Sequence, residues 1–433
     1  MRRKVPDLCI TSNLLQKYRS GTLKPVDTIR NVIERIETTK RGAVFTSRVS
    51  NEILIERALQ VESEMDPMTS PLYGVPFVVK DNIDVEGFVT TNGLSPEHLS
   101  PESASSPVVN TLLDAGAILV GKTNMDQLAT GLVGTRSPYF GETYNSFSPD
   151  HISGGSSSGS AVAVACGFAS FSLGTDTAGS GRVPASFNNI FGYKPSLGLL
   201  STRGVRPACA SLDCVSIFGV TLDDTRYVAR LSAFFDESHP YSRKLKAGPR
   251  FETKSKLRIA IPSSPYFAQD EEARELYENA IQVLEERTNT EVVRIDYDIF
   301  VECAKLLYEG PWVAERFDAN RELMLNSNDK KYLDPTVETI LNGSIDHKSY
   351  DAFNAFNKLK KIQMQTSHLL KDFDCLIHPT VMFKITHTPL SLEKQNTFID
   401  PGTDTSLASR RCASRSDRIE FAEWVLHKSH ELT

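Results

Sequence analysis

The sequence has little of what marks a secreted or zinc-binding protein. Its cysteines are odd in number and include no C-x-x-C pair, so neither a disulfide framework nor a zinc knuckle is indicated. We therefore expect no metal and a reducing, cytoplasmic location. The seven positions are Cys9, Cys166, Cys209, Cys214, Cys303, Cys375 and Cys412.

Long hydrophobic runs and runs of basic residues are also missing. The longest apolar run, residues 161–171, is too short and too rich in small residues to span a bilayer. The basic N-terminus, residues 1–13, has no apolar stretch of secretory length. The formal net charge of −6 argues against a protein that binds nucleic acid by neutralising its phosphates. These absences exclude nucleic acid and membrane as expected partners and favour a small molecule.

The sequence does have enough apolar residues for a large core, since 40% of its 433 residues are hydrophobic. Residues 26–37 carry apolar side chains at helical spacing after Pro25, and the apolar run 72–79 ends at Lys80 as a buried strand would. Residues 108–120 predict a helix that stops at Gly116 and a strand after it. Such alternation predicts an α/β fold, a sheet covered by helices. Later segments predict strands at 257–261, 291–297 and 375–378, and helices at 271–287, 302–325 (interrupted near Gly310 and Pro311) and 349–371.

A first glycine-rich segment, residues 154–159, reads GGSSSG and allows three interpretations. A phosphate-binding loop requires lysine where Ser160 stands. A nucleophile elbow centred on Ser157 requires a buried strand before it, but residues 146–153 are polar and contain a proline. A flexible linker does not suit a segment that leads directly into a run of small apolar residues. None of the three interpretations explains this segment well.

A second glycine-rich segment, residues 174–182, reads GTDTAGSGR and suits acyl transfer. Its small residues allow the backbone N–H groups of Thr177, Ala178, Gly179 and Ser180 to point at one oxygen, as an oxyanion hole requires. Ser180 is then the candidate nucleophile. No histidine motif pairs with it, so the base has to be another residue. A lysine buried at the end of an apolar strand, such as Lys80, can serve, because desolvation lowers the pKa of a lysine. The alternative is a structural lysine held in an ion pair.

Residues 153–184 resemble the signature segment of the amidase signature family, and GVPFVVKDN around Lys80 resembles the lysine strand of that family. The resemblance implies a mixed central sheet covered by helices on both faces. It also implies a Ser-Ser-Lys triad, in which Ser180 is the nucleophile, Ser156 relays the proton after a cis peptide bond from Gly155, and Lys80 is the base. No cofactor is implied. For Asp176 and Arg182 we expect an ion pair that supports the loop.

Residues 171–219 and 129–139 show a finer resemblance, to the amidase domain of allophanate hydrolases. This implies hydrolysis of allophanate, a small anionic amide, in urea degradation. It implies that Gly131, Tyr308 and Arg316 contact the substrate, with the guanidinium clamping a carboxylate. A packing role for Tyr308 and a solvated position for Arg316 are the alternatives. The resemblance further suggests a functional link to urea carboxylase and allows a homodimer.

The resemblance extends from about residue 14 to about residue 380. We therefore expect an amidase domain at 1–384, incomplete at its C-terminal end, and a divergent, polar tail at 385–433 that could be disordered. Two other functions stay open. One is the glutaminase subunit of a tRNA-dependent amidotransferase, or another small-amide amidase, with the same three residues. The other is a catalytically impaired remnant that binds a ligand or a partner.

Overall fold

The computed structural model describes residues 10–134, 137–244, 255–267, 270–325 and 330–381, and the chain forms two compact units. Unit 1 comprises Met1–Leu245 and Glu322–Val337, and unit 2 comprises Lys246–Arg321 and Glu338–Thr433. The amidase domain expected at 1–384 stays a prediction, and the tail expected at 385–433 lies outside the described residues.

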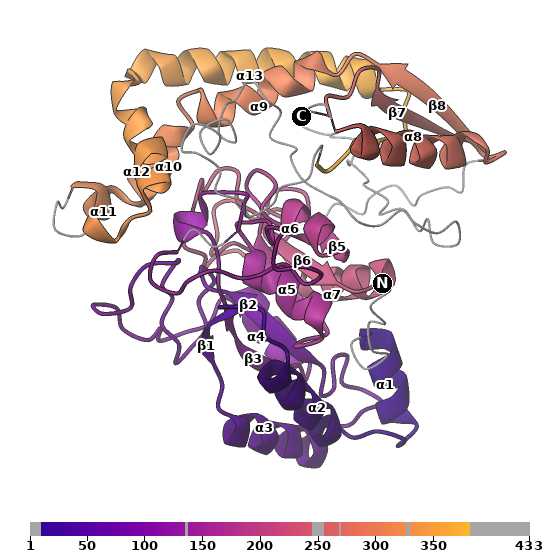
Figure 1. Cartoon of the computed structure of the whole chain (residues 1–433), viewed down its shortest axis with the longest axis vertical. Helices are drawn as coiled ribbons and strands as arrows, with labels where there is room; N and C mark the ends of the chain where they lie inside the picture. The colour runs from indigo at the N-terminus through magenta and orange to yellow at the C-terminus, as the bar shows by residue number, and fades with distance from the viewer. Residues whose placement is uncertain (1–9, 135–136, 245–254, 268–269, 326–329, 382–433) are drawn as a thin grey trace. The chain divides into compact units, whose positions relative to one another are not determined.

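Unit 1 is built on a mixed sheet of six strands in the order β1-β3-β2-β4-β6-β5 (Figure 1). Strand β2 runs parallel to both of its neighbours, β3 and β4, whereas the other pairs are antiparallel. The strands are β1 Phe45–Arg48, β2 Pro76–Lys80, β3 Ile118–Thr123, β4 Phe171–Thr175, β5 Phe191–Tyr193 and β6 Val215–Gly219. The helices are α1 Thr11–Arg19, α2 Pro25–Thr38, α3 Asn51–Glu64, α4 Pro107–Asp114, α5 Ser158–Cys166, α6 Arg182–Phe187 and α7 Leu222–Ser232, with a 3-10 turn η2 at Gln127–Ala129.

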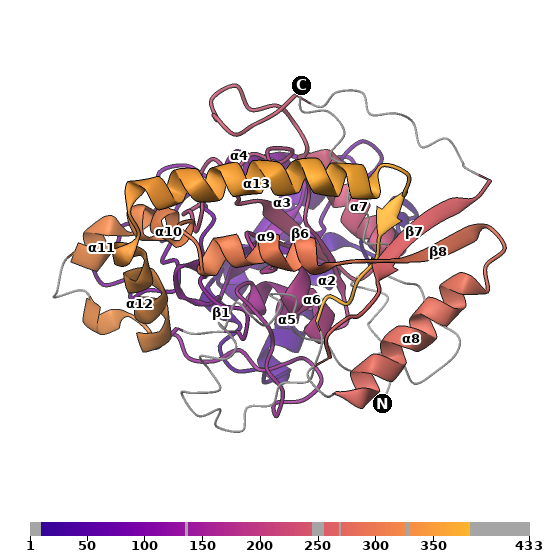
Figure 2. The ribbon, with the colours of Figure 1, turned by 90° about the horizontal axis from the view of Figure 1, so that it is seen from above.

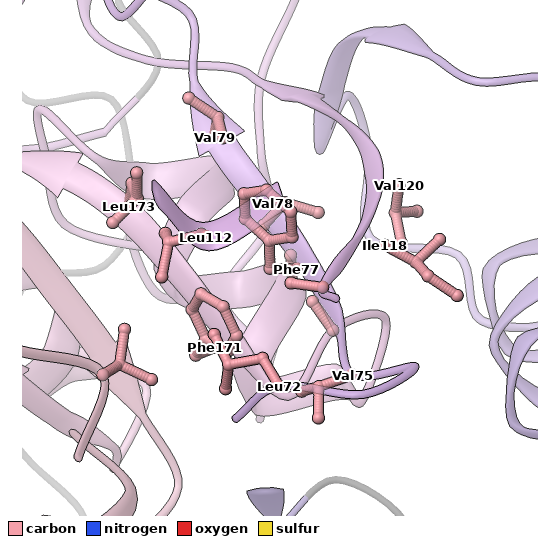
Figure 3. Packing of buried hydrophobic residues seen from close by; sticks show 14 of the residues in the cluster. Leu72, Val75, Phe77, Val78, Val79, Leu112, Ile118, Val120, Phe171 and Leu173 are labelled. Carbon is pink, nitrogen blue, oxygen red and sulfur yellow. The ribbon is translucent and has the colours of Figure 1, made fainter. Parts of the chain in front are cut away.

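The central strands of this sheet are covered on both faces, because every residue of β2, β4 and β6 is buried. Figure 3 shows the apolar residues around β2, where Phe77 and Phe171 stack with ring centroids 5.3 Å apart. Helix α5 consists of small residues, all buried, and packs on β2, β3, β4 and β6. The expected α/β fold with helices flanking the sheet is confirmed.

Two sequence predictions in unit 1 can be compared with the structure element by element. Helix α2 begins at Pro25 and buries Val26, Ile29 and Ile33, as its spacing predicts. Strand β2 begins only at Pro76, whereas the apolar run begins at residue 72. The preceding residues form a turn in which Gly74 has a φ of 68°, and this backbone conformation keeps them out of the strand.

Unit 2 contains a parallel three-stranded sheet, β8-β7-β9, with α8 packed on β8. Figure 2 shows α9 and α13 side by side, and an ion pair of 2.7 Å joins Lys358 to Glu302 between them. The interruption expected near Gly310 and Pro311 within 302–325 is confirmed, and the chain also turns near residue 320, where no break was expected. The elements are β7 Leu257–Pro262, α8 Glu271–Glu285, β8 Thr290–Ile295, α9 Asp298–Tyr308, α10 Val313–Ala319, η4 Gly343–Asp346, α13 Ser349–Leu370 and β9 Cys375–Leu376.

Between the two stretches of sequence that form unit 2, the chain returns once to unit 1. The returning segment, Glu322–Val337, includes most of α11 Arg321–Leu325, η3 Lys330–Tyr332 and the start of α12 Pro335–Asn342. Gln127 anchors it: the side-chain amide donates to the Tyr332 carbonyl and accepts from the Asp334 N–H, both at 2.8 Å. Among the described residues, no helix combines the length and hydropathy needed to cross a bilayer.

Candidate active site

Lys80 lies at the carboxyl end of β2 and is fully buried. Because β2 and β4 are parallel, their carboxyl ends meet at one edge of the sheet, which brings Thr175, the last residue of β4, next to Lys80. The Lys80 amine Nζ donates to Ser156 Oγ at 2.8 Å and to Thr175 Oγ1 at 2.7 Å. The predicted base and the predicted relay serine are therefore in direct contact.

Ser156 follows a cis peptide bond from Gly155, as the family resemblance implies. The segment before it is fixed by backbone pairing, in which Gly154 N–H donates to the Val133 carbonyl and Gly155 N–H to the Leu132 carbonyl, at 3.1 and 2.9 Å. Helix α5 begins two residues later, at Ser158. Ser156 is thus held between a paired loop and the start of a buried helix.

Ser157 takes no part as an elbow nucleophile. It is fully buried and its hydroxyl donates to the Thr175 carbonyl at 3.1 Å. The residues before this segment form no strand, as their polarity predicted. Ser157 thus ties the Ser156 segment to the end of β4.

Ser180 lies in the turn between β4 and α6 and is 4% exposed. The hydrogen bonds of the described residues include none between the hydroxyls of Ser180 and Ser156. The structure thus contains the first link of the predicted relay, Lys80 to Ser156, whereas the second link, Ser156 to Ser180, stays a proposal.

The predicted oxyanion hole needs one revision. The Gly179 N–H donates to Asp176 Oδ1 at 2.7 Å, so this carboxylate already uses one of the four expected donors. Within the described part of the chain, no hydrogen bond engages the backbone N–H of Thr177, Ala178 or Ser180. We restrict the proposed oxyanion donors to these three residues.

Asp176 and Arg182 form the expected ion pair, with Nε to Oδ2 at 2.9 Å and Nη2 to Oδ1 at 3.0 Å. Burial alone would raise the pKa of Asp176, but the bidentate Arg182 guanidinium holds it well below its usual range. The charged carboxylate also accepts the Gly179 N–H and so fixes the turn that carries Ser180. A supporting role for Asp176 and Arg182 stays a proposal.

The three residues expected to contact the substrate lie in both units. Gly131 belongs to unit 1 and has a φ of 144°, a conformation that favours glycine. Tyr308 and Arg316 belong to unit 2, where the guanidinium lies 5.2 Å from the ring centroid and Nη2 donates to the Tyr308 hydroxyl at 3.4 Å. Arg316 is buried, so the alternative of a solvated helix residue is wrong. Substrate contact by all three stays a proposal.

Sequence reasoning missed three residues around Lys80 and Ser156. Thr175 accepts from Lys80, Asn82 donates to the same Thr175 hydroxyl at 3.1 Å, and Asp126 donates from its N–H to the Ser156 carbonyl at 3.1 Å. Thr175 directly precedes Asp176 and Asn82 lies two residues after Lys80, so closeness in sequence was a usable signal. Asp126 carried no such signal. Among the described residues, no group of His, Cys, Asp or Glu side chains could hold a metal ion.

Comparisons relate this chain to known proteins. A family model described as Amidase matches residues 27–403. Urea amidolyase of Saccharomyces cerevisiae is 45% identical over 338 residues, which cover 78% of this chain and 18% of that protein. Allophanate hydrolase of Kluyveromyces lactis has a solved structure with a TM-score of 0.81 and 38% identity, covering 90% of this chain and 62% of that one.

A third relative is a subunit of an amidotransferase. One subunit of the glutamyl-tRNA(Gln) amidotransferase of Mycoplasma pneumoniae is 41% identical over 231 residues, covering 52% of this chain and 45% of that protein. The chain spans about a fifth of the length of the urea amidolyases that it matches. The family model covers most of the chain and includes Lys80, Ser156 and Ser180. This chain therefore belongs to the amidase signature family.

Proposed function

We propose that the chain hydrolyses the amide bond of allophanate and releases ammonia, using Ser180, Ser156 and Lys80. The observation that carries the proposal is the buried contact of 2.8 Å between Lys80 Nζ and Ser156 Oγ, at the strand end beside the turn of Ser180. A lysine in this position has a hydroxyl partner through which it can take a proton.

In the proposed reaction, Ser180 Oγ attacks the carbonyl carbon of the terminal amide. Its proton passes to Ser156, and Ser156 passes its own proton to the uncharged Lys80 amine. The backbone N–H groups of Thr177, Ala178 and Ser180 stabilise the negative oxygen of the tetrahedral intermediate. The C–N bond then breaks, and the departing amine takes the proton back along the same path. Water hydrolyses the acyl-enzyme, which leaves N-carboxycarbamate and frees Ser180.

We propose allophanate rather than glutamine as the substrate because the match to urea amidolyase covers 78% of this chain, whereas the match to the amidotransferase subunit covers 52%. Unit 2 contributes Tyr308 and Arg316, which supply a phenol and a guanidinium in contact with each other. A guanidinium suits a carboxylate. A link to urea carboxylase, a homodimer and a cytoplasmic location stay predictions from the sequence.

A substrate panel tests the proposal. Purified protein should release ammonia from allophanate faster than from malonamate, acetamide or glutamine, and mass spectrometry should find N-carboxycarbamate or its decarboxylation product. Ser180→Ala should remove both this activity and labelling by a fluorophosphonate probe. A preference for an uncharged amide would overturn the substrate assignment. Folded protein that neither reacts with the probe nor hydrolyses any amide would instead support a remnant that only binds.

Replacing Arg316 by methionine should raise the KM for allophanate roughly 10- to 100-fold, because a bidentate contact to the substrate carboxylate is lost. Arg316→Lys should recover little, since an ammonium cannot reproduce the planar fork. Steady-state kinetics on allophanate measure both effects.

The matched control for this prediction is Arg321→Met. Arg321 lies five residues further along, and its exposed side chain pairs with Asp318. Its loss should leave the KM unchanged, and neither variant should change the rate at which an uncharged fluorophosphonate labels Ser180. An unaltered KM in Arg316→Met would exclude Arg316 from substrate binding.

A further inference from the structure

We propose that Asp126 is a positioning residue that holds the loop of Gly131–Gly134 against the segment Gly154–Ser156. It would act through its neighbours, since it supports both the proposed relay serine and the glycine expected beside the substrate. The inference rests on the proposed roles of Ser180, Ser156 and Lys80.

The Asp126 carboxylate lies among glycines from both segments. The Gly134 N–H donates to Oδ2 at 3.3 Å. A Cβ built at Gly155 would lie 1.9 Å from the same oxygen, and one built at Gly131 would lie 2.9 Å from it. Real side chains essentially never approach so closely, so the carboxylate fills the space that the two glycines leave.

The backbone of Asp126 makes the second contact. Its N–H donates to the Ser156 carbonyl at 3.1 Å, directly on the residue whose hydroxyl meets Lys80. The two segments are also paired with each other, through Gly154 to Val133 and Gly155 to Leu132. Asp126 therefore touches both paired segments: its carboxylate contacts glycines of both, and its backbone N–H donates to Ser156.

The position of Asp126 itself is firmly defined. It is fully buried and precedes the turn η2, where Leu128 and Ala129 have φ values of 55° and 52°. Such left-handed conformations at residues other than glycine are costly and persist only where surroundings enforce them. Here Leu128 N–H donates to the Asn92 carbonyl at 2.9 Å, and Gln127 is anchored to the returning segment. These contacts of η2 fix the position of Asp126, the residue before the turn.

These contacts predict what each substitution will do. Asp126→Ala should free the loop and displace Ser156, and a misplacement of about 1 Å can lower a catalytic rate about 100-fold. Asp126→Asn should keep most of the rate, because its amide oxygen can still accept the Gly134 N–H. Asp126→Glu keeps the charge but adds a methylene where the carboxylate already contacts Gly155, so it should lose activity nearly as alanine does.

The experiment compares the second-order rate constant for fluorophosphonate labelling of Ser180, and kcat and KM for allophanate, in these three variants. Asp224→Asn and Asp224→Ala are the matched controls, since Asp224 is also a buried carboxylate and accepts the N–H groups of Thr11 and Ser12 at 2.9 and 3.0 Å. The controls should lower the thermal unfolding temperature and leave the labelling rate unchanged. In Asp126→Ala the labelling rate and kcat should both fall, with rescue in Asp126→Asn.

Wild-type labelling rates in folded Asp126→Ala, or a loss no larger than in an equally destabilised Asp224 variant, would overturn the positioning role. If Asp126→Ala does not fold, the pair Asn and Glu decides, because the proposal requires a high rate in the first and a low rate in the second. Failure of the proposed function has a different signature: the wild type would then be labelled at a residue other than Ser180, or not at all.

Discussion

Replacing Lys80 by methionine is expected to lower kcat for allophanate by about 10,000-fold, because the serine then has no base. Methionine fits the buried space at the end of β2 but cannot accept a proton. The hydroxyls of Ser156 and Thr175 lose their shared partner, which now lies 2.8 and 2.7 Å away. Single-turnover release of ammonia measures the loss without interference from product release.

The pH dependence separates a base from a merely structural lysine. Wild-type activity should fall as the pH is lowered, because protonation of the amine removes the base. The residual rate of Lys80→Met should instead rise in proportion to hydroxide concentration. Lys122→Met is the control, since Lys122 is also fully buried and lies opposite Val79 on the neighbouring strand. It should lose stability but keep the wild-type profile. A wild-type pH profile in Lys80→Met would remove Lys80 from the mechanism.

The sequence predicted the parts of the site that follow from local pattern. Lys80 was placed at a strand end by the apolar run before it, and β2 does end there. The glycine-rich residues 174–182 were expected to include a loop supported by an ion pair, and residues 176–181 do lie outside helix and strand beside the Asp176–Arg182 pair. Both inferences use only neighbours in sequence, where period and residue size determine the local backbone.

What the sequence could not give are contacts between distant segments. Thr175 lies 95 residues from Lys80, and Asp126 and Ser156 come from separate segments, so no periodicity relates the partners. The same limit explains the oxyanion prediction. Counting small residues suggested four equivalent N–H groups, but the Asp176 side chain folds back onto Gly179 and takes one of them. Which donor a side chain captures depends on its rotamer, and residue type alone does not specify that.

A second buried lysine, Lys122, also has a partner from a distant segment that sequence pattern does not predict. The alternative for Lys80 was a structural ion pair, and the structure has such a pair next to it, between Lys122 Nζ and Asp81 Oδ1 at 2.9 Å with both side chains fully buried. Lys122 also donates to Thr90 Oγ1 at 2.7 Å, and Asp81 accepts from the Thr91 hydroxyl. Burial raises the pKa of Asp81 and lowers that of Lys122, and the attraction between them opposes both shifts. The pair ties the residue after Lys80 to β3 and to the loop at residues 89–91.

Breaking this pair should have the largest effect on stability of any single change argued from the structure. Lys122→Met leaves the Asp81 charge buried without its partner, which should lower the free energy of unfolding by about 3–5 kcal/mol. Asp81→Asn should lower the free energy of unfolding by a similar amount, because it leaves the Lys122 charge buried without its partner. The double variant should lose less than the sum of the two, because neither charge then remains uncompensated. Urea unfolding of the three variants measures these differences.

The control is an ion pair in the same unit that is more exposed than the pair of Lys122 and Asp81. Arg206 Nη2 meets Glu102 at 2.7 Å, but its side chain is 50% exposed, so solvent screens the interaction. Glu102→Gln should therefore cost at most about 1 kcal/mol. If Glu102→Gln and Lys122→Met lose equal free energy of unfolding, burial does not set the strength of these pairs. If the losses of the two single variants add up in the double variant, Asp81 and Lys122 act independently. The expected result is a coupled pair, in which the loss of either charge leaves the other buried without its partner.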